Sequence, residues 1–217
     1  MFLVIIIVLI VGIFIYGAYF SEKAVTKRKI KNATPKAISD CQDGDIARIT
    51  GEIQVVDEPL EAPLTKRPCS MYTVVIQEHK HRGKSRHWVD IISEEKFNRF
   101  VLKDGDKLAL VEATNLKSRL ISDGSFESGF LNNATPELEA FLNKHGHKSE
   151  GLFGMNKSMK YLEGILEQGE RASVVGKVQW KEATELGIPG STRRILSITG
   201  FDKEAVIVTD DPNLVNG

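Results

Sequence analysis

The sequence predicts an α+β fold in which a single N-terminal transmembrane helix precedes a mainly β domain, barrel- or sandwich-like, with two or three helices. Three observations lead to this prediction. Residues 1–20 form an unbroken apolar run, later residues alternate short apolar runs with turn signals, and two segments carry apolar residues at helical spacing. We therefore divide the chain into a transmembrane helix at 1–20, a basic juxtamembrane linker at 21–38, a β-rich domain at 39–210 and a tail at 211–217.

The apolar run at 1–20 contains no charged side chain. A helix rises about 1.5 Å per residue, so this run would span roughly 30 Å, the thickness of a bilayer's hydrocarbon core. A cleavable signal peptide is the alternative, but no Lys or Arg precedes the run and no A-x-A cleavage site ends it. Tyr16 and Tyr19 would lie at the membrane interface, where aromatic side chains gather.

The flank that follows, residues 21–31, carries five cations and one acid, with Lys27, Arg28 and Lys29 in its centre. We expect these three side chains to lie at the membrane interface, where they attract anionic headgroups. The positive-inside rule then predicts a single-pass membrane protein with a cytoplasmic domain. A solvated charge run that merely ends a helix is the alternative.

The composition narrows the class of partner. The chain has 29 basic and 29 acidic residues, so no net charge draws it to nucleic acid, and we expect no nucleic-acid partner. Its two cysteines, Cys41 and Cys69, are too few for a disulfide framework or a RING zinc site. Whether these two pair with each other stays open.

The β-strands are predicted from turn signals that introduce apolar runs. Asp-Gly-Asp triplets at 43–45 and 104–106 introduce runs at 46–56 and 108–111. A β-hairpin is predicted from about 70 to 93, because Tyr72, Val74 and Ile76 alternate with more polar positions before an Arg-Gly-Lys turn.

Two helices are predicted in the second half of the chain. Thr135 and Pro136 begin the first, which continues over an apolar stripe to 142 and ends before Gly146. The second is expected at 157–168, where apolar residues recur at helical spacing before Gly169.

A short internal similarity links two distant segments. Gly44 and Gly51 stand seven residues apart in a turn followed by an apolar run, and Gly169 and Gly176 stand in the same relation. Each copy predicts a turn that leads into a strand bent or bulged at its second glycine. The alternative is chance likeness between two turn-strand units.

The sequence motifs predict no catalytic residues and no cofactor. The sequence lacks G-x-S-x-G, H-E-x-x-H and G-x-G-x-x-G. A weak metal hypothesis rests on His79, His81 and His87, which the hairpin would bring together, but the surrounding Lys and Arg side chains would repel a cation. Cys69 has the pattern of a small buried hydrophobic residue, with no identifiable base beside it.

Several short segments, in order along the chain, resemble one known family. They are residues 49–53, 58–63, 68–72, 77–80, 87–88, 166–170, 175–178 and 207–210. Together they resemble the GIDE or beside-a-membrane (BAM) domain family over residues 48–210. The best-known members are mitochondrial outer-membrane E3 ubiquitin ligases of the MULAN type.

The resemblance implies a domain placed next to a membrane. In the ligases, ubiquitin transfer depends on a C-terminal RING, which follows a second transmembrane helix, and this sequence contains neither. Ubiquitin ligase activity would therefore be a family label, and the architecture is similar to that of RING-less prokaryotic members, inferred to sense or bind something at the membrane. In the mitochondrial relatives the domain faces the intermembrane space, so an extracytoplasmic domain is the alternative to the cytoplasmic one.

We therefore expect a non-enzymatic binding, sensing or scaffolding module, integral to the lipid bilayer, that holds a protein partner or a membrane-associated ligand. The candidate binding residues lie on or before the predicted hairpin: Cys69, Tyr72, His79, His87 and Trp88. The alternative is an enzyme component, either an E3 ubiquitin ligase-like protein or a metal-binding activity.

Overall fold

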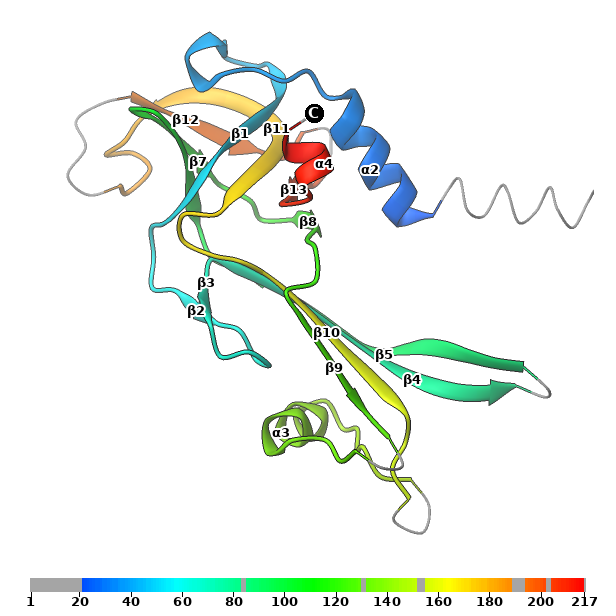
Figure 1. Ribbon diagram of the computed structural model, residues 1–217. Coiled ribbons are helices and arrows are strands. Elements are labelled where there is room, and N and C mark those ends of the chain that lie inside the picture. The colour runs from blue at the N-terminus through cyan, green and yellow to red at the C-terminus, as the bar shows by residue number, and fades with distance from the viewer. Residues whose placement is uncertain are drawn as a thin grey trace, which may run out of the picture.

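The computed structural model describes residues 21–82, 85–129, 132–151, 155–188, 194–201 and 204–216. Within these ranges, no helix is both long enough and apolar enough to cross a bilayer. The predicted anchor at 1–20, with Tyr16 and Tyr19, lies outside the described residues. Figure 1 shows two β-units, a barrel that carries the N-terminal helix α2 and a second sheet that projects away from it.

Five strands close a mixed β-barrel, so the predicted mainly β domain is confirmed and takes the barrel form. Their order is β1 (Ile46–Val55), β6 (Phe100–Asp104), β7 (Lys107–Val111), β12 (Arg194–Thr199) and β11 (Arg171–Glu182), which pairs back onto β1. The pair β7–β12 is parallel and the other four are antiparallel. Two further strands, β13 (Val206–Thr209) and β8 (Leu116–Arg119), extend the sheet beyond β11.

The barrel interior is one cluster of buried apolar side chains, including Ile49, Phe100, Leu102, Val174 and Ile198. These residues come from four different strands, so closing the barrel removes their apolar surface from water.

The internal similarity of the sequence corresponds to a local two-fold arrangement of β1 and β11. The Gly44 N–H donates to the Val178 carbonyl at 2.9 Å, and the Gly169 N–H donates to the Ile53 carbonyl at 2.8 Å. Each glycine lies in a turn at positive φ, +93° and +84°. The predicted turn-strand units are therefore confirmed, and the two copies pair with each other as neighbouring strands, with a register that continues through Gly51 and Gly176 without the predicted bulge.

The second glycine of each copy allows a close approach to a neighbouring strand. A Cβ on Gly51 would stand 2.7 Å from the Lys103 carbonyl oxygen, and one on Gly176 would stand 2.7 Å from the Thr199 carbonyl oxygen. Both distances are shorter than a carbon–oxygen contact permits, so a larger residue would force the strands apart at either site.

The second unit is a four-stranded antiparallel sheet with one helix on one face. Its order is β5 (Ser85–Phe97), β4 (Met71–Arg82), β10 (Met159–Leu166) and β9 (Gly124–Ser128). The strands β4 and β5 confirm the predicted hairpin, and Tyr72, Val74 and Ile76 are its buried face. The helix α3 (Pro136–Lys144), N-capped by Thr135, confirms the first predicted helix. It packs Leu138, Phe141 and Leu142 against the buried face.

The second predicted helix, at 157–168, is wrong, because most of this segment is the strand β10. Met159, Tyr161, Glu163 and Ile165 alternate with Lys160 and Leu162, and β10 pairs with β4 on one side and β9 on the other. The Glu163 carboxylate is fully buried and accepts the backbone N–H groups of Leu64 and Thr65, at 2.7 and 2.9 Å. Long-range pairing decides the conformation here over local helical spacing.

The remaining elements connect or cover these units. The strands β2 (Leu60–Glu61) and β3 (Pro68–Cys69) form a small hairpin before β4, and a 3₁₀ turn spans Ile38–Asp40. The short helix α4 (Pro212–Val215) follows β13.

The helix α2 (Glu22–Asn32) packs on the barrel. Ser21 is its N-cap and Ile30 is fully buried. With Val175, Ile207 and Leu214, Ile30 forms a separate hydrophobic cluster on the outside of the barrel.

Candidate functional site

A groove of about 770 Å³ lies between the two β-units, beside the first turns of α2. Its volume is within the range of about 300–1,000 Å³ that is usual for ligand sites. Three distant parts of the chain line it, namely α2, the strands β4 and β5, and β8 with the residues that follow. The lining residues are Ser21, Thr26, Thr73, Val75, Ser93, Glu94, Glu95, Lys117, Ser118, Arg119, Leu120, Ile121, Ser122 and Asp211.

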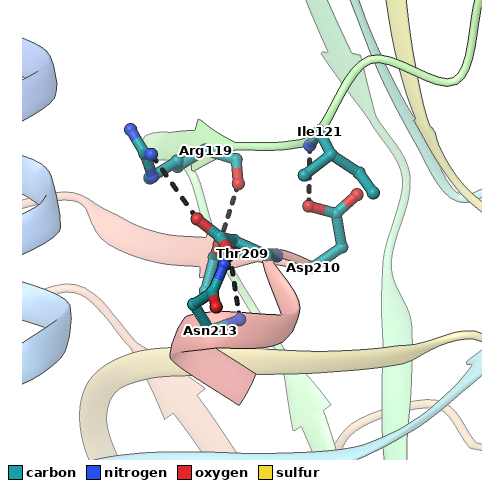
Figure 2. A network of polar contacts seen from close by, with 6 residues as sticks. Arg119, Ile121, Thr209, Asp210 and Asn213 are labelled. Atoms are coloured by element: carbon teal, nitrogen blue, oxygen red, sulfur yellow. Dashed lines mark hydrogen bonds and ion pairs between the residues drawn. The ribbon is translucent and has the colours of Figure 1, made fainter. Parts of the chain in front are cut away.

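The wall formed by β8 and α4 is a hydrogen-bonded network around Arg119 (Figure 2). The Thr209 hydroxyl donates to the Arg119 carbonyl at 2.8 Å, and Asp211 accepts the backbone N–H of Asn213 at 3.0 Å. The Arg119 guanidinium reaches Asp211 through Nη2 at 3.4 Å. Burial favours a higher pKa for Asp211, but the hydrogen bonds from Asn213 and the nearby guanidinium outweigh it and lower the pKa.

Arg119 retains hydrogen-bonding capacity inside this wall. Its Nε is buried and finds no hydrogen-bond partner among the residues that the structure describes. A buried donor left unpaired costs free energy.

The opposite wall, formed by β4 and β5, carries carboxylates and hydroxyl groups. Glu94 accepts a hydrogen bond from the Tyr72 hydroxyl at 2.6 Å and lies 2.9 Å from the Nε2 of His145 at the end of α3. Burial favours a higher pKa for Glu94, yet these two hydrogen bonds and the nearby lysines lower it. The Glu94 carboxylate is thus held ionised against α3, on the sheet face opposite to that of Thr73, Val75, Ser93 and Glu95, which line the groove.

The two walls therefore present opposite charges across the groove. Lys117 and Arg119 lie on the β8 side and Glu95 lies on the β5 side, whereas Glu94 is opposite Val74 and directs its carboxylate to the α3 face of the sheet. Six Ser or Thr residues add short polar groups between them. This arrangement suits a ligand that carries both acceptors and donors, such as an extended peptide segment.

A buried acid lies next to the groove. The Asp210 side chain is 4% exposed, accepts the Ile121 backbone N–H at 2.8 Å through Oδ1, and has no partner for Oδ2 within the described chain. Burial, together with the nearby carboxylates of Glu170 and Asp123, raises the pKa of Asp210 to about 7. Figure 2 shows Asp210 pointing toward Ile121, away from the Arg119 guanidinium.

Two of the candidate binding residues from the sequence are buried. Cys69 is a free thiol, 0% exposed, and burial raises its pKa to about 11. Cys41 is likewise free and buried. Tyr72 is 4% exposed and bonds to Glu94 on the α3 face of the sheet.

The other candidates lie at the outer end of the hairpin. Trp88 is opposite His79, with their rings 4.8 Å apart, whereas His87 is opposite Lys80. Directly opposed residues share a face of a sheet and neighbours alternate, so His79 and His87 lie on opposite faces. The expectation that His87 reaches across to His79 is therefore wrong. Among the described residues, no three His, Cys, Asp or Glu side chains are grouped to hold a metal ion.

The interface candidates on α2 differ from one another. Lys27 is exposed, Arg28 is half-buried, and Lys29 forms an ion pair with Glu204 at 2.5 Å. Lys29 thus helps to fix α2 to the barrel.

Sequence analysis missed the groove, including Thr73, Ser93, Glu94, Lys117 and Arg119. One local signal was present, since Asp211 followed by Pro212 is a typical helix start and marks α4. Comparison of the chain with protein-family models, curated proteins and solved structures gives no match.

Proposed function

We propose that this chain is a membrane-anchored, non-enzymatic scaffolding module that holds a segment of a protein partner in the groove beside α2. The observation that carries the proposal is the position of the groove. Ser21 and Thr26 of α2 line it, and Ser21 immediately follows the apolar run at 1–20. A partner in the groove would therefore lie next to the bilayer.

The packing of α2 supports this proposal. Ile30 is fully buried on the barrel, and the ion pair between Lys29 and Glu204 adds a second attachment. A flexible linker would let the domain move away from the membrane, but a packed helix of 11 residues keeps it within roughly 16 Å of the anchor.

The polar groups of the groove support a peptide ligand. The partly exposed Arg119 guanidinium offers N–H donors on one side, and the Glu95 carboxylate with the hydroxyl groups of Thr73 and Ser93 offers acceptors on the other. A polypeptide supplies carbonyl acceptors and N–H donors at regular intervals along its length. The resemblance to the GIDE/BAM family, whose members lie beside membranes, favours the same function.

Site-specific photo-crosslinking in native membranes tests this proposal. A photoreactive amino acid in place of Ser93, inside the groove, should give a discrete protein adduct with the full chain. The matched control has the same group in place of Lys107, an exposed residue of the barrel turn. Arg119→Glu should abolish the Ser93 adduct, because it replaces a cation of the groove with an additional acid.

Two results would contradict the proposal. The first is an adduct that forms equally from both positions, since this would reflect general proximity. The second is a Ser93 adduct that Arg119→Glu leaves unchanged. The anchor is tested separately, because alkaline carbonate should leave the full chain in the membrane pellet.

A further inference from the structure

The outer end of the β4–β5 hairpin extends beyond the rest of its sheet. The strand β10 pairs with β4 from Leu166 opposite Met71 to Met159 opposite Glu78, and the hairpin continues past Glu78 as two strands. In Figure 1 this end projects away from the barrel toward the same side as the N-terminal end of α2. Two strands without a packed third are of marginal stability in water, so a partner surface would stabilise this projection.

Basic and aromatic side chains are concentrated at this end. The sequence over 79–88 holds four Lys or Arg residues and no Asp or Glu. Trp88 is 38% exposed, its ring stacks on His79, and the Lys160 ammonium lies 4.6 Å from the ring centroid. Lys80 and Arg86 are exposed on the two strands.

The charge changes sign toward the base of the hairpin. The acids of β5 are Asp90, Glu94 and Glu95, all nearer to the barrel than Trp88. The hairpin is therefore polarised, with a cationic, aromatic outer end and an acidic base.

We infer that the outer end of this hairpin is a second membrane contact, which binds anionic phospholipid headgroups beside the anchor. Tryptophan and basic side chains are the residues that favour the headgroup region of an anionic membrane. The inference rests on the proposed function, because the anchor places the hairpin at a bilayer. With both contacts formed, the groove would have a fixed orientation to the membrane surface.

The fluorescence of Trp88 can report contact between the hairpin and lipid. The chain has two tryptophans, and Trp180→Phe leaves Trp88 as the single fluorophore. The full chain with this substitution is placed in nanodiscs of brominated phosphatidylcholine, alone or mixed with phosphatidylglycerol. Bromine quenches tryptophan on contact, so we expect Trp88 to be quenched several-fold more in the anionic discs, and high salt should remove the difference.

Reversing the charge of basic residues on the hairpin tests whether its contact with lipid is electrostatic or only a result of proximity to the membrane. Lys80→Glu with Arg86→Glu should abolish the additional quenching in anionic discs. The matched control is Lys103→Glu with Lys107→Glu, which replaces two exposed lysines of the barrel. It changes the net charge by the same amount and should leave the additional quenching intact. Circular dichroism confirms that each variant is folded.

The outcomes distinguish this inference from the proposed function. If the chain co-elutes with the discs but Trp88 is quenched equally in neutral and anionic lipid, the hairpin contact is overturned and the anchor stands. If the chain does not co-elute, the anchor fails and the inference fails with it. A change in Trp88 fluorescence when an acidic protein is added, without additional quenching in anionic discs, would also overturn the inference.

Discussion

Ile30 of α2 and Val175 of β11 lie in one closed hydrophobic cluster on the outer surface of the barrel. The two residues are far apart in the sequence, and Ile30 sits within a segment of five basic residues. This cluster makes the basic segment part of the folded domain. The groove and the residue that follows the proposed anchor at 1–20 are therefore connected through a packed helix.

Ile30→Ala should detach α2 from the barrel. Removing a buried Ile side chain costs about 2 to 5 kcal/mol, and the exposed ion pair between Lys29 and Glu204 contributes little by comparison. We expect a lower unfolding midpoint in denaturant and faster tryptic cleavage within α2. Lys31→Gln changes an exposed residue on the same helix and should leave both measurements unchanged.

Gly51→Ala and Gly176→Ala should destabilise the barrel by similar amounts. Each new Cβ would stand 2.7 Å from a carbonyl oxygen of the next strand, so the backbone must shift at a cost of about 1 to 3 kcal/mol. The midpoint of thermal unfolding of each variant measures this loss of stability. Gly129→Ala is the control, because its Cβ would meet Ser158 at an ordinary 3.7 Å. An equal loss at Gly129 would contradict the close-approach explanation.

Glu163→Gln should destabilise the junction between the two β-units. The carboxylate accepts two backbone N–H groups, and an amide keeps one acceptor while placing its NH₂ against the other donor. An unsatisfied buried donor costs about 1 to 3 kcal/mol. Chemical denaturation would show the loss, whereas Glu127→Gln, at an exposed position, should change stability by under about 0.5 kcal/mol.

Asp210→Asn should change how stability depends on pH. The pKa of Asp210 is about 7 in the folded protein and about 4 in an unfolded chain, so the folded state holds the extra proton between these values. The stability contributed by Asp210 is fully present below about pH 4 and is lost as the pH rises through 7. Relative to the wild type, Asp210→Asn should therefore gain stability between pH 5 and 8, by up to roughly 4 kcal/mol.

Asp211→Asn provides the matched control for this pH dependence. The hydrogen bonds from Asn213 and the Arg119 guanidinium lower the pKa of Asp211 despite its burial. Its carboxylate thus stabilises the fold above the unfolded pKa, and this contribution is lost as the pH falls through the lowered folded value. Asp211→Asn should be less stable than the wild type at pH 7. Parallel pH profiles for both variants would contradict the assignment of the raised pKa to Asp210.

Local sequence signals predicted the elements whose determinants are close together in the chain. The hairpin at 70–93 and the helix after Thr135 were predicted because alternation, turn residues and caps act within a few residues. The strand β10 was mistaken for a helix because its apolar residues fit both periods, and its pairing with β4 and β9 decides between them.

The groove could not be predicted in this way. Its walls come from α2, from β4 and β5, and from residues 117–122, which are brought together by the fold. Arg119 and Glu94 look like ordinary surface charges in the sequence. Their importance depends on burial and on partners such as Asp211 and His145.

The pairing of β1 with β11 has a consequence for synthesis. During translation β1 emerges early, whereas β11 follows after the whole second sheet and α3. At about 5 to 20 residues per second, the 115 residues between them (56–170) take on the order of 6 to 23 s. The hairpin sheet can form in that interval, but one edge of β1 stays unpaired at the ribosome until the barrel closes. A chain that inserts its N-terminus into a membrane at this stage would complete its barrel against the bilayer, where neighbouring chains are concentrated and exposed strand edges promote aggregation.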